Sequence, residues 1–316
     1  MTRAFIFPGQ GSQDVGMGRD LAQNFRAAKD VFDEVDAALG AKLSAIMWEG
    51  PKETLTLTEN AQPALMAVSM AVMRVLQQEK GFQLADKVKF VAGHSLGEYS
   101  ALAAAGAFTL ADAAKLLRLR GQAMQAAVPV GVGAMTALLG VSLDIARKIA
   151  VDAAAAGGGV CDIANDNDPT QIVLSGSKTA IDKVAEVGKA HGLRRAIALP
   201  VSAPFHCSLM QPAADAMAAA LATARVNKPV VPVMANVTAA PVSDPAEIKR
   251  LLVAQVTGTV RWRECMMALA AAGVTDFYEV GAGKVLTGLA GRIDKTLKAQ
   301  AVGSMADIDA VWAGLA

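Results

Sequence analysis

One segment of the chain predicts a strand, a sharp turn and a helix in direct succession. The apolar run from Val88 to Ala92 favours a buried strand, and the alanine-rich stretch from Glu98 to Gly106 favours a helix. Between them lies Gly93-His94-Ser95-Leu96-Gly97. A Gly-x-Ser-x-Gly sequence also occurs as an ordinary turn, but in this context it predicts a nucleophile elbow above a parallel sheet. Ser95 is therefore the candidate nucleophile, and the backbone N–H of Leu96 is a candidate oxyanion donor.

The alternation of strands and helices along the chain predicts the fold class. Such alternation is typical of a parallel sheet with helices on both faces. Before the elbow, we expect a strand at Ala4 to Phe7 and helices near Asp20 to Leu39 and Ala61 to Glu79. After Pro200 we expect strands at Val230 to Asn236 and Asp276 to Val280, and helices at Gln211 to Ala224, around Glu264 to Ala272 and from Val285.

Residues 130–199 show a different order of predicted elements, β-α-β-β-α-β. We expect strands at Ala134 to Val141, Val160 to Ala164, Gln171 to Ser175 and Arg194 to Leu199, with helices at Ser142 to Ala155 and Lys178 to His191. This order is ferredoxin-like, and Asn165 to Pro169 is predicted to supply the turn between the middle strands. The sequence thus predicts an α/β fold: an α/β-hydrolase-like parallel-sheet domain (residues 1–129 and 200–316) with an inserted ferredoxin-like small domain (residues 130–199).

Composition limits the classes of partner. The formal net charge is +1 and aromatic residues make up 4%, so the basic stripes and stacking surfaces of nucleic-acid-binding proteins are missing. The apolar run at the N-terminus is too short for a signal peptide. The longest apolar stretch, Val128 to Val141, is shorter than a bilayer span and contains Pro129. Cys161, Cys207 and Cys265 are far apart and are expected to be free thiols. We expect a cytoplasmic protein that binds neither nucleic acid nor membrane.

A serine nucleophile needs a base, and the chain contains three histidines. His94 adjoins Ser95, and its side chain is expected to point away from the hydroxyl. His191 ends a predicted helix just before a glycine, which is typical of a structural C-cap. His206 lies in the loop where the inserted domain is expected to return to the large one. His206 is therefore the candidate base.

The loop from Phe7 to Gln13 is glycine-rich, with a glycine on each side of Gln10. Such a loop can bring a backbone N–H close to a developing oxyanion, although it also suits a phosphate-binding loop or a tight turn. The dinucleotide-binding fingerprint fails because Asp14 stands where its third glycine would be. Gly283-Lys284 lacks the other residues of a P-loop. Nucleotide binding is not expected.

Seven segments together carry a resemblance to a known family. They are FPGQGSQ at Phe7 to Gln13, GHSLGEYSAL at Gly93 to Leu102, RGQAMQ at Arg120 to Gln125, IANDN at Ile163 to Asn167, PFH at Pro204 to His206, QVTGTVRW at Gln255 to Trp262 and EVGAGKVLTGL at Glu279 to Leu289. With these segments the chain resembles, from end to end, the malonyl-CoA:acyl carrier protein transacylases of fatty acid and polyketide synthesis. Relatives often have proline where Ala282 stands. The inserted ferredoxin-like domain is also part of the family's architecture.

The resemblance implies a role for each residue of the catalytic group. Ser95 would attack the thioester carbonyl of malonyl-CoA, and His206 would take the hydroxyl proton and return it to the departing thiol. Leu96 and Gln10 would supply the backbone donors of the oxyanion hole. The backbone carbonyl of Gln255 would orient the histidine in place of a triad aspartate.

The resemblance also implies a substrate-binding group. On its own, Arg120 in a basic helical segment beside Arg118 would be a solvated charge. The family match implies instead that its guanidinium binds the malonyl carboxylate with two parallel hydrogen bonds. Phe205 would favour malonyl over branched extender units. Asn165 would line the pocket from the small domain, with Asn167 as the alternative.

We therefore expect a ping-pong acyltransferase that passes malonyl from malonyl-CoA through Ser95 to the phosphopantetheine thiol of acyl carrier protein. No metal or bound cofactor is implied, because CoA and the holo carrier are substrates. We expect a monomer that serves fatty acid synthesis, with the polyketide pathway as the alternative. A serine hydrolase or thioesterase with the same elbow, and a carrier-docking protein without activity, are the competing hypotheses. Arg120 and the lack of a clear acidic triad partner favour the transferase over the hydrolase, and the presence of both Ser95 and His206 argues against an inactive protein.

Overall fold

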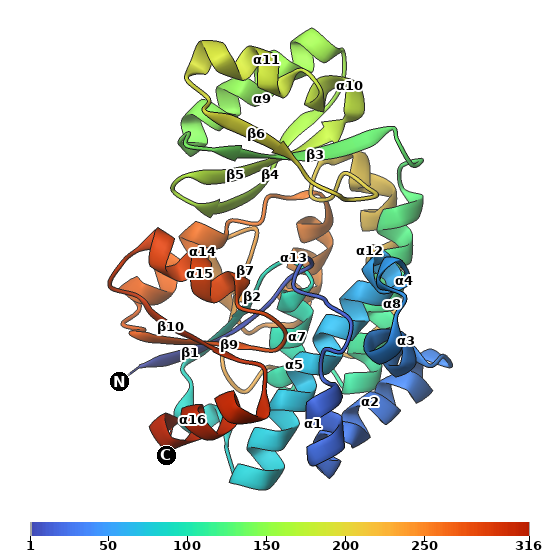
Figure 1. Cartoon of the computed structure of the whole chain (residues 1–316), viewed down its shortest axis with the longest axis vertical. Coiled ribbons are helices and arrows are strands. Elements are labelled where there is room, and N and C mark those ends of the chain that lie inside the picture. Colours follow the sequence, from blue (N-terminus) through green and yellow to red (C-terminus); the bar gives the residue numbers. More distant parts are fainter. Residues whose placement is uncertain (1, 316) are drawn as a thin grey trace.

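The computed structural model describes residues 2–315, which form an α/β protein built on two sheets (Figure 1). The larger sheet has the strand order β10-β9-β1-β2-β7-β8. Its strands are β1 (Arg3–Phe7), β2 (Phe90–Gly93), β7 (Val233–Ala235), β8 (Ala240–Val242), β9 (Asp276–Val280) and β10 (Lys298–Val302). All neighbouring strands of this sheet pair in parallel except β7 and β8, which are antiparallel. The predicted α/β class is confirmed.

Helices cover both faces of the larger sheet, as the alternating side chains of β1 require. Phe5 and Phe7 join the core formed with α2, α5, α7 and α8, whereas Ala4 and Ile6 face the core formed with α14 and α15. The helices packed around this sheet are α1 (Arg19–Asn24), α2 (Arg26–Leu39), α3 (Leu43–Glu49), α4 (Lys52–Thr56), α5 (Thr58–Lys80), α6 (Leu84–Lys87), α7 (Gly97–Ala104), α8 (Leu110–Ala126), α12 (Gln211–Thr223), α13 (Pro245–Thr257), α14 (Trp262–Ala271), α15 (Val285–Ile293) and α16 (Met305–Leu315). Ser208–Met210 form the short 3₁₀ helix η2 before α12.

The smaller sheet is antiparallel, has the strand order β4-β5-β3-β6 and lies at the top of Figure 1. Its strands are β3 (Gly133–Leu139), β4 (Cys161–Asp168), β5 (Gln171–Ser177) and β6 (Arg195–Ala198). The helices that belong to it are α9 (Leu143–Gly157), α10 (Lys178–Ile181), α11 (Val184–Gly188) and the 3₁₀ helix η1 (Lys189–His191). A separate apolar cluster lies between this sheet and its helices.

The prediction that Asn165 to Pro169 supplies a hairpin turn is wrong for most of that segment. Residues 165–168 are the buried end of β4, and the turn follows them. The backbone of this strand end forms two hydrogen bonds with Val260, which belongs to the part of the chain around the larger sheet. Val260 N–H donates to Ala164 O at 2.9 Å, and Asp166 N–H donates to Val260 O at 3.0 Å. The buried Asp166 carboxylate also accepts from Arg263 at 2.8 Å. These long-range bonds satisfy polar groups that would otherwise favour a solvated turn.

Several predicted boundaries also differ from the structure. The helix expected at Lys178 to His191 is divided into α10, α11 and η1, and the one expected at Asp20 to Leu39 is interrupted at Phe25, whose backbone is extended. The elements that were not predicted include α3, α4, α6, β8, β10, α13 and α16. Within residues 2–315, none of the helices combines the length and the apolar character needed to cross a bilayer.

Candidate active site

The turn that carries Ser95 is shaped by the two glycines that flank it. A Cβ on Gly93 would lie 1.9 Å from the carbonyl group of Gly97, and one on Gly97 would lie 2.3 Å from Phe7 O. No real side chain tolerates such contacts, so both positions require glycine. The turn then drives Ser95 into the left-handed region, with φ of 53°. This strained conformation between β2 and α7 is the predicted nucleophile elbow.

Ser95 and His206 form a hydrogen-bonded pair although 111 residues separate them. Ser95 Oγ lies 2.7 Å from His206 Nε2, and His206 Nδ1 lies 2.9 Å from the backbone oxygen of Gln255. A carbonyl oxygen only accepts, so Nδ1 carries the ring proton and Nε2 is left as the acceptor for the serine hydroxyl. Burial, assisted by the positive charge of Arg120, lowers the pKa of His206 to about 3. The imidazole is thus held neutral, which is the form a general base needs.

A side-chain amide fixes the elbow from the neighbouring strand. Asn236 follows β7, and its Oδ1 accepts from Ser95 N–H at 2.8 Å while its Nδ2 donates to Gly93 O at 2.7 Å. Its backbone N–H donates to the carboxylate of Glu98 at 3.0 Å. The Asn236 side chain therefore ties the backbone of the elbow to the end of β7.

Arg120 is buried beside Ser95, with only 1% of its surface exposed. Its Nη2 donates to Ser95 Oγ at 3.2 Å and to Gln255 Oε1 at 2.8 Å, and its Nη1 donates to Gln62 Oε1 at 2.9 Å. Within residues 2–315 its Nε has no hydrogen-bond partner. Burial lowers the pKa of Arg120, and nearby Glu98 opposes that shift. A buried cation with an unused donor favours an anionic ligand.

A cleft of about 450 Å³ lies over this group, at the junction of the two sheets' domains. Its wall on the larger-sheet side includes Gln10, Ser95 and Arg120, and the smaller sheet contributes Met135 and Asn165. Phe205, His206, His94, Gln62, Met124 and residues 199–201 complete most of its lining. The cleft brings together residues that are far apart in the sequence, and it is large enough for a small acyl group with the end of a long arm.

Of the two residues predicted to supply oxyanion donors, Leu96 follows Ser95 in the chain and Gln10 lines the cleft over it. Leu96 directly precedes the first turn of α7, where backbone N–H groups lack helical acceptors. Gln10 belongs to the loop after β1, which approaches the elbow so closely that a Cβ on Gly9 would lie 2.8 Å from His94 O. The loop that carries Gln10 thus packs against the elbow that carries Ser95 and Leu96.

The other two histidines have different partners. His94 Nε2 lies 2.8 Å from Asn167 Oδ1, whereas the serine hydroxyl bonds to His206 and Arg120. His191 Nε2 lies 2.6 Å from an oxygen of Asp152 on α9, and Gly192 follows it in the left-handed conformation. Asn165 rather than Asn167 lines the cleft.

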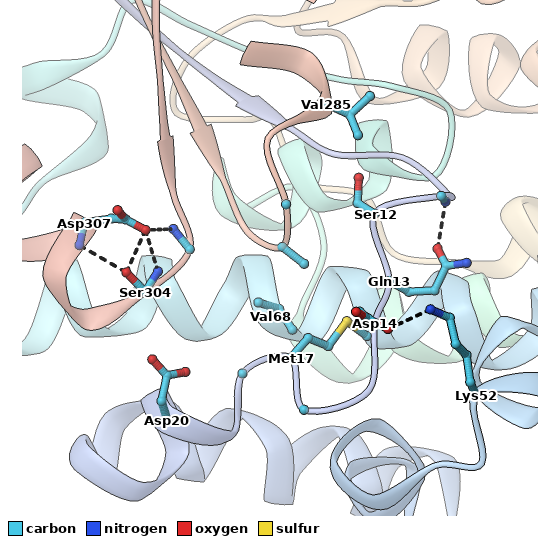
Figure 2. A pocket seen from close by; sticks show the side chains of 16 residues that line it. Ser12, Gln13, Asp14, Met17, Asp20, Lys52, Val68, Val285, Ser304 and Asp307 are labelled. Atoms are coloured by element: carbon cyan, nitrogen blue, oxygen red, sulfur yellow. Dashed lines mark hydrogen bonds and ion pairs between the residues drawn. The ribbon is translucent and has the colours of Figure 1, made fainter. Parts of the chain in front are cut away.

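A second cavity, of about 640 Å³, lies beside the loop that follows β1 and is lined by its residues Ser12, Gln13 and Asp14 (Figure 2). It shares Gly11, Gln13 and Lys52 with the cleft over Ser95. Its polar groups include the carboxylates of Asp14 and Asp307, the first paired with Lys52 Nζ at 3.0 Å. The Ser95–His206 pair does not line it, so the chemistry belongs to the smaller cleft.

Three buried residues of the site were not found from the sequence: Gln62, Glu98 and Asn236. Each acts through hydrogen bonds to residues that are distant in the chain. Gln62 stands at the start of the buried, mostly apolar stretch 61–73 of α5, and Glu98 lies in the first turn of α7, which is buried throughout. A polar residue in a buried stretch of helix was the available signal, because such a group needs a partner.

The fold and the site together define an enzyme whose cleft contains a hydrogen-bonded serine–histidine pair and a buried arginine. The chain belongs to the acyl transferase family, since the family described as "Acyl transferase domain" matches residues 4–308. The family resemblance inferred from the sequence motifs is confirmed, and the protein is an acyltransferase.

Individual relatives agree over nearly the whole chain. The malonyl CoA-acyl carrier protein transacylase of Bacillus subtilis (strain 168) is 45% identical over 299 residues, which cover 95% of this chain and 92% of the relative. The crystal structure of an acyl-carrier-protein-S-malonyltransferase from Bartonella henselae is 56% identical, with a TM-score of 0.97 and coverage of 100% of this chain and 99% of that one. A malonyl-transacylase solved in complex with a type II polyketide synthase acyl-carrier protein is 40% identical, with a TM-score of 0.95 and coverage of 99% and 100%.

Proposed function

We propose that this protein transfers the malonyl group of malonyl-CoA to the phosphopantetheine thiol of acyl carrier protein. The observation that carries the proposal is a serine–histidine pair that shares its cleft with a buried arginine. The names of the relatives, and the carrier protein bound to one of them, support the same substrate and partner. The malonyl units would serve fatty acid synthesis.

The first half-reaction acylates Ser95. His206 Nε2 takes the hydroxyl proton as Ser95 Oγ bonds to the thioester carbon, and the backbone N–H groups of Leu96 and Gln10 donate to the oxyanion. The C–S bond then breaks, and the imidazolium gives its proton to the departing CoA sulfur. The Gln255 carbonyl, 2.9 Å from Nδ1, holds the ring in the tautomer that both steps need.

The second half-reaction repeats these steps in reverse with a new thiol. The pantetheine thiol of the carrier gives its proton to His206, and its sulfur attacks the ester carbon. Collapse of the oxyanion releases Ser95 Oγ, which regains the proton from the imidazolium. CoA and the holo carrier are both substrates, so the proposed cycle uses no metal or bound cofactor.

Arg120 is proposed to bind the free carboxylate of the malonyl group. Its Nη2 is 3.2 Å from the nucleophilic oxygen, so an acyl chain on Ser95 lies within reach of the guanidinium. The carboxylate would replace part of the solvation that Arg120 lacks in its buried position. Phe205 and Asn165 line the same cleft and would limit the size of the group beside the carboxylate.

The finer description of the fold is also part of this proposal. The strand order β4-β5-β3-β6, with its two crossover connections, supports a ferredoxin-like small domain of residues 130–199. The elbow between β2 and α7 supports an α/β-hydrolase-like large domain of residues 1–129 and 200–316. The cleft at their junction would shield the acyl-enzyme from water. We further propose a monomeric, cytoplasmic protein, consistent with its three buried, free cysteines.

The proposal is tested by letting water and a thiol compete for the acyl group. The protein is mixed with malonyl-CoA, with and without holo acyl carrier protein, and both malonyl carrier and free malonate are measured. Transfer to the carrier that exceeds the release of malonate supports the transferase. Accumulation of malonate with an unmodified carrier would instead identify a hydrolase that uses the same elbow.

A further inference from the structure

Behind Ser95, two buried side chains of opposite charge are separated by a neutral amide. Arg120 is 1% exposed and Glu98 is 2% exposed, and within residues 2–315 no direct ion pair joins them. The side chain of Gln255, which is fully buried, lies between them. Its Oε1 accepts from Arg120 Nη2 at 2.8 Å, and its Nε2 donates to Glu98 Oε2 at 2.8 Å.

The chemistry of the two charged groups fixes the direction of this amide. A guanidinium only donates hydrogen bonds, so the amide oxygen must face Arg120. An ionised carboxylate only accepts them, so the amide nitrogen must face Glu98. Nε2 of Gln255 also donates to Ser95 O at 3.0 Å, which ties the amide to the elbow. The Gln255 side chain therefore has a single orientation.

Without this amide, the two charges would attract each other strongly in a poorly polarisable interior. A direct pair with Glu98 would turn the guanidinium away from the cleft and neutralise it. Gln62 holds the other side of the guanidinium, through Nη1 at 2.9 Å, but its amide nitrogen faces Met124 Sδ rather than a carboxylate. The two glutamines thus accept similar hydrogen bonds from Arg120, but only Gln255 also donates to a carboxylate.

We propose that the Gln255 side chain is a specificity-positioning residue: a neutral spacer that keeps Arg120 from pairing with Glu98. The guanidinium then stays available to an acyl group that ends in a carboxylate. This inference rests on the proposed function. It is separate from the role of the Gln255 backbone carbonyl, which bonds to His206 and is retained when the side chain is replaced.

The test combines a substitution of Gln255 with removal of the negative charge of Glu98. The variants are Gln255→Met, Glu98→Gln and the double substitution, and Gln62→Met with and without Glu98→Gln is the matched control. KM and kcat are measured separately for malonyl-CoA and acetyl-CoA, with holo acyl carrier protein as acceptor. Burial raises the pKa of Glu98 to about 7, so the assay is run at a pH of about 8, where Glu98 is ionised.

We expect Gln255→Met to raise the KM for malonyl-CoA by about tenfold or more, because Arg120 then pairs with Glu98. Acetyl transfer also loses the bond from the Gln255 amide to Ser95 O, but it needs no cation, so it should fall by a smaller factor than malonyl transfer. Adding Glu98→Gln should lower the malonyl KM again. In the Gln62→Met background, the same addition should give no such recovery.

Two outcomes would overturn the inference: an unaltered malonyl KM in Gln255→Met, or a double variant no better than Gln255→Met. Equal losses of malonyl and acetyl transfer without recovery would mean that the side chain is merely structural. If Gln255→Met does not fold, Gln255→Leu takes its place with the same expected signs. Failure of the wild-type protein to transfer malonyl at all would overturn the proposed function itself, and it is visible before any variant is made.

Discussion

Replacing Arg120 by methionine tests whether a buried charge selects the substrate. Methionine fills much of the same space without the charge or the donors. A hydrogen bond to a charged group contributes about 1.5–3 kcal/mol, and a buried charge left without its partner costs about 3–5 kcal/mol. Arg120 is almost fully buried, so little solvent would replace it. At about 1.4 kcal/mol per tenfold change, kcat/KM for malonyl-CoA should fall by about 100-fold to 3,000-fold.

The assay compares malonyl-CoA with acetyl-CoA as donors to holo acyl carrier protein. Acetyl has no carboxylate, so its kcat/KM should stay within about threefold of wild type or rise. Arg118→Met is the control, because Arg118 lies on the same helix, bonds to Asn60 and does not line the cleft. Equal losses with both donors in Arg120→Met would refute the reasoning, since they would show damage to the serine and histidine rather than to carboxylate binding.

Four further predictions concern the base, the elbow and the contact between β4 and the residues around α14. Burial lowers the pKa of His206 to about 3, so the acylation rate measured by stopped flow should not fall as the pH is lowered from about 7 to 5. A fall in the rate centred near a pH of about 6.5 would contradict this. The unfolded chain binds that proton below a pH of about 6.5, so the free energy of unfolding should decrease as pH falls from there toward 3. Gly97→Ala should lower the free energy of unfolding in urea by about 2 kcal/mol or more, because the new Cβ would lie 2.3 Å from a backbone oxygen of β1. The control Gly291→Ala, which lies in open space on α15, should not lower it. Asp166→Asn weakens the 2.8 Å bond to Arg263 and should cost about 1–3 kcal/mol in the same experiment; an unchanged value would show that this bond does not stabilise the contact.

The elbow and the fold class could be predicted because their signals are local. An apolar strand, Gly-x-Ser-x-Gly and a helix lie within twenty residues of one another, and the two glycines make contacts that only glycine allows. The alternation of strands and helices likewise needs no long-range information. The choice of His206 as base came from eliminating His94 and His191, and its 2.7 Å contact with Ser95 agrees with that choice.

The parts that were missed depend on partners far away in the sequence. Asn and Asp residues favour turns when solvated, so Asn165 to Pro169 was expected to be one. In the structure, Arg263 and Arg292 pair with two of its carboxylates, and Val260 pairs with its backbone, which keeps residues 165–168 in a buried strand. The sequence of that segment does not indicate that its partners lie about 95 to 124 residues further along the chain.

Gln62 and Glu98 show the same limit at the site. Their polarity stands out in buried helices, but the sequence does not reveal which groups they meet. Arg120 shows the converse case: among neighbouring charges it was expected to be solvated until the family motif indicated otherwise, and the structure buries it. Local pattern thus predicted the elements, while long-range packing determined which polar side chains face each other.

The central claim, a malonyl group carried on Ser95, is tested most directly by intact-mass spectrometry. Wild-type protein and the Ser95→Ala variant are each mixed with malonyl-CoA, and holo acyl carrier protein is then added. The account predicts that the wild-type protein gains the mass of one malonyl group, that peptide mapping assigns this group to Ser95, and that it moves to the carrier. The variant should gain nothing. Malonylation of the variant, or a wild-type adduct that the carrier does not remove, would contradict the account.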